Sequence, residues 1–263
     1  MVEHMHEMDF GASASTWDDM PGVKAQNELF LTTLPSHIPS LEGKRVLDFG
    51  TGSGGKALAL ADHPDPSMRP REVVGADISE KMLEVFAAKI AAREAPEEGG
   101  EGDDDVTPVS GLQVDERASQ LADQEAFDVI IPSLVLHHID PACKDDVYAA
   151  LFAALAPGGV VFAQEFDTPD GSNSASIVGS LQSAGFVDVA VIPTDFDMDI
   201  VKHSFHAIHN DPHNGGHSHG HPHSHSHSHS HSHSHGGDDS NPDSPPHVFP
   251  WSSAIFIIAH RPQ

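Results

Sequence analysis

A glycine-rich loop is the part of this chain whose residue types and spacing are best suited to holding a ligand. It lies within VLDFGTGSGGKALALA, residues 46–61. Glycines let a backbone approach a ligand closely or adopt positive φ, and a following helix directs its N-terminus at that ligand. Gly50, Gly52 and Gly55 fit the G-x-G-x-x-G spacing of dinucleotide sites, whereas Gly50, Gly52 and Gly54 equally fit G-x-G-x-G. The glycine spacing alone therefore leaves the ligand open.

The carboxylate of Asp48, two residues before the loop, favours a cationic ligand. Facing a pyrophosphate it would cost Coulomb energy, whereas facing an ammonium group it is favourable. S-adenosylmethionine (SAM) offers an α-ammonium, a sulfonium and no phosphate. Asp77, at the end of the apolar run 72–77, is placed to accept hydrogen bonds from two ribose hydroxyls of either ligand. Asp48 thus favours SAM over a dinucleotide, and Asp77 does not discriminate.

Short apolar runs alternate with helical patterns, and these elements must position the loop and the carboxylates. Strands are expected at 45–50, 72–77, 111–114, 127–133, 158–166, 186–193 and 253–260. Helices are expected at 79–94, with Ser79 as N-cap, and at 144–155, ending before Pro157 and Gly158. This alternation predicts an α/β fold, a parallel sheet covered by helices on both faces. We expect no helix between the last two strands, which can then pair as an antiparallel hairpin at one edge.

Composition narrows the class of protein and of partner. The 263 residues suffice for one α/β domain with a proper core. The chain has 40 acidic and 13 basic residues, which give a net charge of −27. This charge disfavours nucleic acids and anionic membranes as partners. A single cysteine, Cys143, fits a reducing compartment, and neither a leader nor a membrane span is evident. We expect a cytoplasmic protein with a small-molecule partner, and a protein acceptor stays open.

Residues 210–246 form a low-complexity segment in which His alternates with Ser. The segment lacks apolar residues that would offset the cost of ordering it, so we predict a disordered insertion within a domain. Imidazole suits Zn, Ni and Cu, and non-catalytic or adventitious metal binding is one interpretation; a tolerated expansion of a loop is the other. The candidate ligands are His217, His219, His221, His223, His225, His227, His229, His231, His233 and His235.

Over most of its length the sequence resembles the class I SAM-dependent methyltransferases. The matching segments stand in the family's order: VLDFGTGSGG, VVGADISEKMLEVFAAK, LQVDER, AFDVIIPSLVLHHI, LAPGGVVFAQE, GFVDVAVIP and AIFIIAH. The front end, STWDDMPGVKA, is similar to that of small-molecule methyltransferases with a Trp-Asp-Asp segment. The resemblance implies a Rossmann-like, doubly wound, mostly parallel seven-stranded sheet with an antiparallel C-terminal edge hairpin. Residues 1–40 would form a capping segment and 41–263 the methyltransferase domain, interrupted at 210–246.

The resemblance also implies which residues bind the cofactor. Asp48 would lie at the methionine end, Asp77 at the ribose, Ile78 against the adenine and Asp115 at the adenine amino group, while Ser133 ends a strand beside the cofactor. The alternatives are a turn or cap carboxylate, an ordinary turn glycine, a core side chain or a solvated loop. The full set is Asp48, Gly50, Gly52, Gly54, Asp77, Ile78, Asp115 and Ser133.

Two adjacent histidines, His137 and His138, are the candidates for acid–base chemistry near the expected methyl group. Methyl transfer is an in-line displacement at carbon, so that holding the acceptor close and aligned supplies most of the catalysis. A base helps only where the acceptor must lose a proton. His138 is slightly favoured, and either histidine is also consistent with packing or capping. Trp17 is a candidate pocket wall, and Lys24 is a candidate for the cofactor carboxylate or a solvated surface lysine.

The sequence thus predicts an enzyme that transfers the methyl group of SAM to a small-molecule acceptor, with the acceptor atom open. Two other classes of function stay open beside it. One is a catalytically silent module that binds the cofactor and acts through a partner. The other is a metal-handling protein that uses the His-rich segment.

Overall fold

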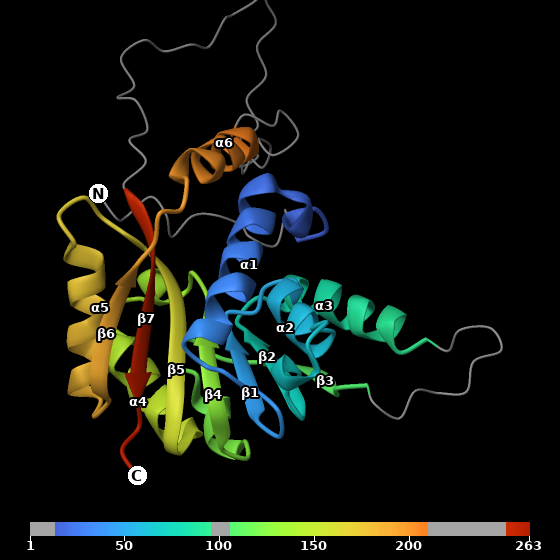
Figure 1. The fold of residues 1–263 in the computed structure, drawn as a ribbon, viewed down its shortest axis with the longest axis horizontal. Coiled ribbons are helices and arrows are strands. Elements are labelled where there is room, and N and C mark those ends of the chain that lie inside the picture. The colour runs from blue at the N-terminus through green and yellow to red at the C-terminus, as the bar shows by residue number, and fades with distance from the viewer. Residues whose placement is uncertain (1–13, 96–105, 210–250) are drawn as a thin grey trace, which may run out of the picture.

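A seven-stranded sheet forms the centre of the computed structural model, which describes residues 14–95, 106–209 and 251–263 (Figure 1). The strand order is β3-β2-β1-β4-β5-β7-β6. The first five strands run parallel, and β7 runs antiparallel to both β5 and β6. The predicted α/β class, the mostly parallel sheet and the antiparallel C-terminal edge are confirmed. The strands are β1 (Arg45–Phe49), β2 (Glu72–Asp77), β3 (Val109–Gln113), β4 (Phe127–Pro132), β5 (Leu155–Asp167), β6 (Val187–Pro193) and β7 (Ser253–His260).

Helices cover both faces of the sheet, as the alternating pattern predicts. The α-helices are α1 (Pro21–Thr33), α2 (Gly55–Ala61), α3 (Glu80–Arg93), α4 (Lys144–Ala154), α5 (Ser172–Ser183) and α6 (Met198–His209). Short 3₁₀ turns are η3 (Trp17–Asp19), η4 (Leu34–Ser36), η5 (Pro66–Met68), η6 (Ser119–Asp123) and η7 (Leu136–His138). The N-cap prediction is confirmed, because the Ser79 hydroxyl accepts a hydrogen bond from the Met82 amide at the start of α3.

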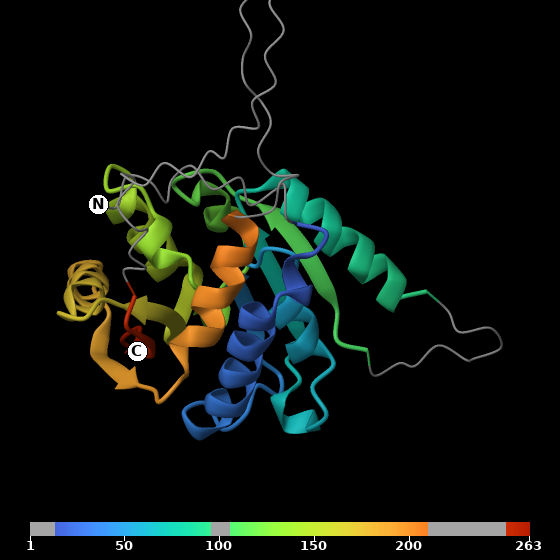
Figure 2. The same cartoon turned by 90° about the horizontal axis from the view of Figure 1, so that it is seen from above.

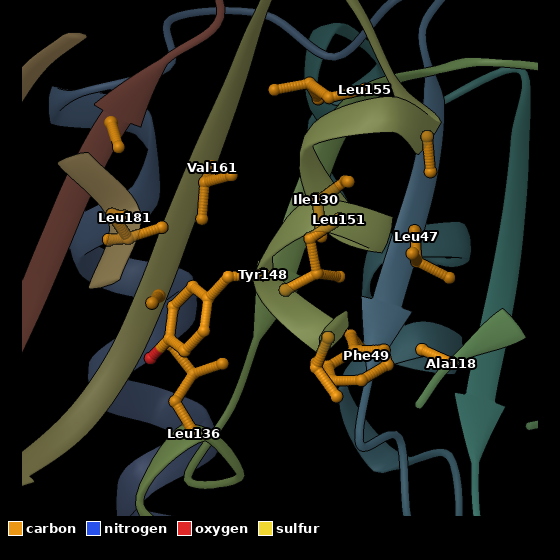
Figure 3. Close-up of a cluster of buried hydrophobic side chains, with 14 of the residues drawn as sticks. Leu47, Phe49, Ala118, Ile130, Leu136, Tyr148, Leu151, Leu155, Val161 and Leu181 are labelled. Carbon is orange, nitrogen blue, oxygen red and sulfur yellow. The ribbon is translucent and has the colours of Figure 1, made fainter. Parts of the chain in front are cut away.

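The core lies on both faces of the sheet because neighbouring β1 residues point in opposite directions. Val46 packs with Phe30 of α1 on one face. Leu47 packs with Leu151 of α4 on the other face. Figure 3 shows this second cluster, in which Ile130 of β4 and Val161 of β5 also take part. The helices α1, α2 and α3 therefore lie on the first face, and α4 and α5 lie on the second.

The expectation that no helix lies between the last two strands is wrong, because α6 follows β6. Met198 and Val201 lie one turn apart and are buried with Phe166 in a small apolar cluster, and this burial favours the helix. The Ser204 hydroxyl of α6 accepts a hydrogen bond of 2.8 Å from the Gly22 amide of α1. Figure 2 shows α1 and α6 side by side above the sheet.

The strands β6 and β7 do pair as predicted, but β7 lies between β5 and β6, so that β6 is the edge strand. The sheet therefore includes chain from both sides of the predicted insertion. The domain boundary at residue 40 stays a prediction. The insertion at 210–246 also stays a prediction, because residues 210–250 lie outside the described residues.

Gly54, the N-cap residue of α2, lets α2 approach α3. Its φ is +83°, a left-handed conformation. A Cβ at this position would lie 1.9 Å from the ring of Phe86, which is buried on α3. The backbone conformation and the close approach both require glycine here.

Replacing Gly54 with alanine therefore combines backbone strain with overpacking. We expect Gly54→Ala to lower the free energy of unfolding by about 2–5 kcal/mol. Gly43→Ala is the matched control: its φ is +71° with nothing within 4 Å of the added Cβ, so that only the backbone strain of about 1–2 kcal/mol applies. Urea unfolding measures both, and equal losses in the two variants would contradict the packing role of Gly54.

Candidate active site

A cavity of about 240 Å³ lies at the carboxyl ends of β1, β2 and β4. The strand order reverses between β1 and β4, and such a reversal opens a crevice in doubly wound sheets. Residues of η3, α1, α2, α6 and the segment before β7 complete the walls. The predicted site residues that line the cavity are Asp48, Gly50, Gly52, Asp77, Ile78, Ser133, His137 and His138. The structure thus brings most of the predicted site together in one pocket.

The structure requires glycine at positions 52 and 54 for different reasons. Gly52 has a φ of +54°, and an added Cβ would meet only the Met82 sulfur, at 3.9 Å. This glycine therefore presents bare backbone to the open pocket, as a ligand-binding loop requires. Gly54 does not line the cavity and serves the contact between α2 and α3. The cofactor role of each glycine stays a prediction.

Asp48 presents a buried oxygen that has no hydrogen-bond partner among the described residues. Its Oδ2 accepts a hydrogen bond of 2.8 Å from the Thr51 hydroxyl, whereas Oδ1 accepts none. Burial raises the pKa of this carboxyl to about 6, against the opposing effect of the Lys56 ammonium. An unsatisfied buried acceptor is costly, and a ligand ammonium at Oδ1 would remove that cost. The residues present here therefore fit the methionine end of SAM.

Asp77, the last residue of β2, binds the backbone of the glycine loop. Its Oδ2 accepts a hydrogen bond of 2.8 Å from the Gly52 amide, and its Oδ1 accepts one of 2.8 Å from the Ser79 amide. Burial raises the pKa of Asp77, and these backbone hydrogen bonds oppose the rise. Each oxygen retains a second lone pair, so that the ribose role is compatible with the geometry and stays a prediction.

Asp115 does not line the main cavity. It lies in a neighbouring hollow that shares Ile78 with the cavity. Its carboxylate caps its own turn by accepting hydrogen bonds from the amides of Arg117 and Ser119 and from the Ser119 hydroxyl. These hydrogen bonds, led by that from the Ser119 hydroxyl, lower its pKa to about 2. The position beside Ile78 is compatible with an adenine contact, which stays a prediction.

His137 is held by a buried carboxylate that sequence reasoning missed. Its Nδ1 lies 2.5 Å from Oε2 of Glu165, and the side chains are 4% and 0% exposed. The other oxygen of Glu165 accepts hydrogen bonds from the amides of Val135 and Leu136. The ring of Trp251 meets that of His137 edge-on at 5.0 Å. His138, which the sequence slightly favours, also lines the pocket, with its ring centroid 4.0 Å from that of His137.

Three further lining or supporting residues were not singled out from the sequence: Lys56, Glu165 and Trp251. A charged residue within an otherwise apolar stretch is the signal that points to the first two. Lys56 interrupts the apolar helix that follows the glycine loop, and Glu165 interrupts the apolar strand β5. Trp251 carries no such signal, because it follows a low-complexity segment and reaches the pocket only through the pairing of β7.

The N-terminal segment is anchored on the glycine loop through Asp18. Its carboxylate accepts a hydrogen bond of 2.8 Å from the Ser53 hydroxyl and forms an ion pair with Lys89 of α3. Trp17 and Asp18 both line the cavity, in agreement with the pocket-wall prediction for Trp17. Lys24 does not line it and pairs with Asp19 at the surface.

The candidate metal ligands His217 to His235 lie outside the described residues. Within residues 14–95, 106–209 and 251–263, no group of three or more His, Cys, Asp or Glu side chains could hold a metal ion. The helices in the same ranges include none long and apolar enough to cross a membrane.

Comparisons with known proteins identify the family of this chain. A family model described as a methyltransferase domain matches residues 47–161. The ubiquinone biosynthesis O-methyltransferase of Bordetella pertussis is 32% identical over 186 residues, which cover 68% of each chain. Its namesake from Idiomarina loihiensis is 32% identical over 163 residues, which cover 58% of this chain and 56% of that protein.

Solved structures share the fold. A putative methyltransferase of Haloferax volcanii, solved with the Trm112 methyltransferase activator, covers 97% of this chain and 98% of its own at a TM-score of 0.57 and 15% identity. A phosphoethanolamine N-methyltransferase of Haemonchus contortus, solved with SAM, covers 97% of this chain and 60% of its own at a TM-score of 0.54 and 17% identity.

This chain belongs to the class I SAM-dependent methyltransferases. The family match and the relatives together support SAM-dependent methyl transfer. The likeness of its front end to the Trp-Asp-Asp type stays a prediction.

The raised pKa of Asp48 predicts how cofactor affinity depends on pH. Because this pKa is about 6 in the free protein, the carboxylate that attracts an ammonium is present above that pH and is protonated below it. The affinity for S-adenosylhomocysteine (SAH) should therefore be level near neutral pH and fall by up to about tenfold per pH unit on acidification below about pH 6. Calorimetry measures SAH affinity as a function of pH, and Asp48→Asn is the control. This variant should bind SAH weakly, and its affinity should show no bend in the pH profile near pH 6. A bend at the same pH in both proteins would assign it to another group.

The anchoring of Asp18 predicts a second effect on binding. Asp18→Ala removes the Ser53 and Lys89 contacts, so that the segment must be ordered when the cofactor binds. Hydrogen bonds to charged groups are worth about 1.5–3 kcal/mol, and partial exposure reduces this, so that we expect the Kd for SAH to rise roughly three- to thirtyfold. Asp19→Ala is the matched control, because its partner Lys24 is at the surface. Equal effects in both variants would refute the anchor.

Proposed function

We propose that this chain transfers the methyl group of SAM to a hydroxyl oxygen of a small, largely apolar acceptor. One observation carries the choice of a hydroxyl: the imidazole of His137 is fixed by the buried Glu165 in the wall of the cofactor pocket. A base is needed only where the acceptor loses a proton. The names of the relatives, which are O-methyltransferases of ubiquinone biosynthesis, agree with an oxygen acceptor.

The acceptor end of the pocket is apolar. Its lining residues are Met20, which precedes α1, Val23 of α1, Phe166 of β5, Val201 of α6 and Trp251. Apolar and aromatic walls with few polar groups bind ligands of similar character. A small molecule that carries an aromatic ring and an acidic hydroxyl fits both this wall and the adjacent histidine.

The contacts of Glu165 assign the proton positions on His137. A carboxylate accepts, so that Nδ1 of His137 carries the hydrogen and donates it to Oε2. Nε2 is then the nitrogen that can accept a proton, and the nearby carboxylate stabilises the resulting imidazolium. When bound, SAM supplies an electrophilic methyl group on a sulfonium. The chain itself holds the acceptor oxygen in line and receives its proton at Nε2 of His137.

Several expectations from the sequence stay predictions beside this proposal. These are the cytoplasmic location, the absence of a nucleic-acid partner, and metal binding by the His-rich segment. A silent cofactor-binding module and a metal-handling protein are the competing functions, and turnover with an acceptor separates the enzyme from both.

A screen of phenolic and other small hydroxyl compounds with methyl-labelled SAM tests the proposal. We expect O-methylated product from at least one phenol, and His137→Gln should lower kcat about 10²–10⁴-fold while SAH affinity is retained. Glu165→Gln should lower kcat less and shift its pH profile, because the imidazolium loses its counter-charge.

His63→Gln, which lies outside the residues that line the pocket, is the control and should leave kcat unchanged. Loss of turnover in His138→Gln but not in His137→Gln would move the base to His138. Product formed only on nitrogen, or none from any hydroxyl compound, would refute the proposal.

A further inference from the structure

Lys56 is a buried lysine whose ammonium has no hydrogen-bond partner among the described residues. It lies in the first turn of α2, is 9% exposed and lines the cavity. Its Nζ lies 5.8 Å from the ring centroid of Phe30, and none of its contacts is a hydrogen bond or a close ion pair with a described residue. Burying an unpaired charge is costly, so this position calls for an anionic partner.

Nearby carboxylates attract Lys56 without pairing with it. Asp48, Asp18 and Glu165 all act on it electrostatically and partly oppose the effect of burial, which lowers its pKa to about 8. Asp18 is already paired with Lys89, and Glu165 with His137. The ammonium is therefore still largely protonated at neutral pH, and its hydrogens remain available to a ligand.

The pocket thus holds an unpaired cation beside an unpaired anion. Oδ1 of Asp48 accepts no hydrogen bond from the described residues, and it interacts electrostatically with Lys56. An amino-acid group, with an ammonium and a carboxylate on one carbon, satisfies both at once. The charges that line the cavity also fit the rest of the ligand. Among the described lining residues, Lys56 is the sole Lys or Arg, whereas three carboxylates line the same cavity, those of Asp18, Asp48 and Asp77. This balance favours a ligand with a net positive charge, and SAM carries one.

We propose that Lys56 binds the carboxylate of the methionine part of the cofactor, while Asp48 binds its ammonium. The inference rests on the proposed use of SAM but not on the choice of acceptor. Lys24, the candidate from the sequence, is at the surface and paired with Asp19. A phosphate in place of the carboxylate is disfavoured, because the carboxylates of Asp48 and Asp18 would repel its greater charge.

Calorimetry with two ligands tests this assignment. The ligands are SAH and its decarboxylated analogue, which keeps the ammonium and lacks the carboxylate. We expect Lys56→Met to weaken SAH binding about ten- to hundredfold, as for loss of a hydrogen bond between charged groups, and to leave binding of the analogue nearly unchanged. The wild-type protein should prefer SAH over the analogue by a similar factor. Lys24→Met is the matched control and should change neither affinity.

Each other outcome overturns the assignment in an identifiable way. An equal loss for both ligands would mean that Lys56 acts on Asp48 or on the fold, since the analogue still reports the ammonium site. Unchanged SAH binding with a raised KM only for acceptors that carry a carboxylate would place the acceptor at Lys56. If Lys56→Met does not fold, Lys56→Gln is measured against the same expectations. Failure of the wild-type protein to bind SAH would refute the proposed function itself, whereas absence of turnover would leave this test intact.

Discussion

Two adjacent polar side chains, buried near the carboxyl end of β5, hold the walls of the pocket together. The side-chain amide of Gln164 donates a hydrogen bond of 3.1 Å to the main-chain carbonyl of Gln26 in α1, and the main-chain carbonyl of Gln164 accepts one from the Leu134 amide beyond β4. Glu165 binds the next two amides and His137. Buried polar groups are costly unless hydrogen-bonded, so the hydrogen bonds that these two residues make favour one arrangement of their partners, although the side-chain Oε1 of Gln164 has no partner among the described residues. The helix over the pocket, the turn after β4 and the candidate base are therefore positioned by the same two residues of one strand.

The electrostatics of the pocket follow from where charges are left unpaired. The net charge of the whole chain, −27, disfavours polyanions, but at the surface it is screened by salt and does not distinguish one small ligand from another. Inside the pocket, burial removes that screening. Asp48 and Lys56 are both buried, and Oδ1 of Asp48 has no hydrogen-bond partner among the described residues; burial of such charges is costly and moves the pKa values of both groups toward neutrality. A zwitterionic ligand pairs with both residues and offsets that cost, so that the pocket favours a ligand that carries both charges.

The sequence could predict what depends on local pattern. Alternating apolar runs predicted the strands, Ser79 marked the start of α3, and the glycine spacing around Gly52 marked a loop that lines the pocket. It could not identify side chains whose role depends on distant partners. Glu165 is an isolated carboxylate in an apolar strand until the fold brings His137 to it. The sequence likewise did not show that both oxygens of Asp115 accept hydrogen bonds within its own turn. The helix α6 was missed because its buried residues pack against parts of the chain far away in sequence, among them α1, β5 and β7.

The two ends of the pocket differ in how the chain builds them, and this explains why one could be predicted and the other could not. The cofactor end comes largely from one stretch, in which β1, the glycine loop and the first turn of α2 follow each other directly. The acceptor end comes from α1, α6 and Trp251, which are far apart in sequence and meet only in the folded chain. A substitution at the acceptor end changes one wall without disturbing the hydrogen bonds around Asp48. On the proposed assignment of the two ends, local sequence identifies the methyl donor, whereas the identity of the acceptor depends on tertiary packing.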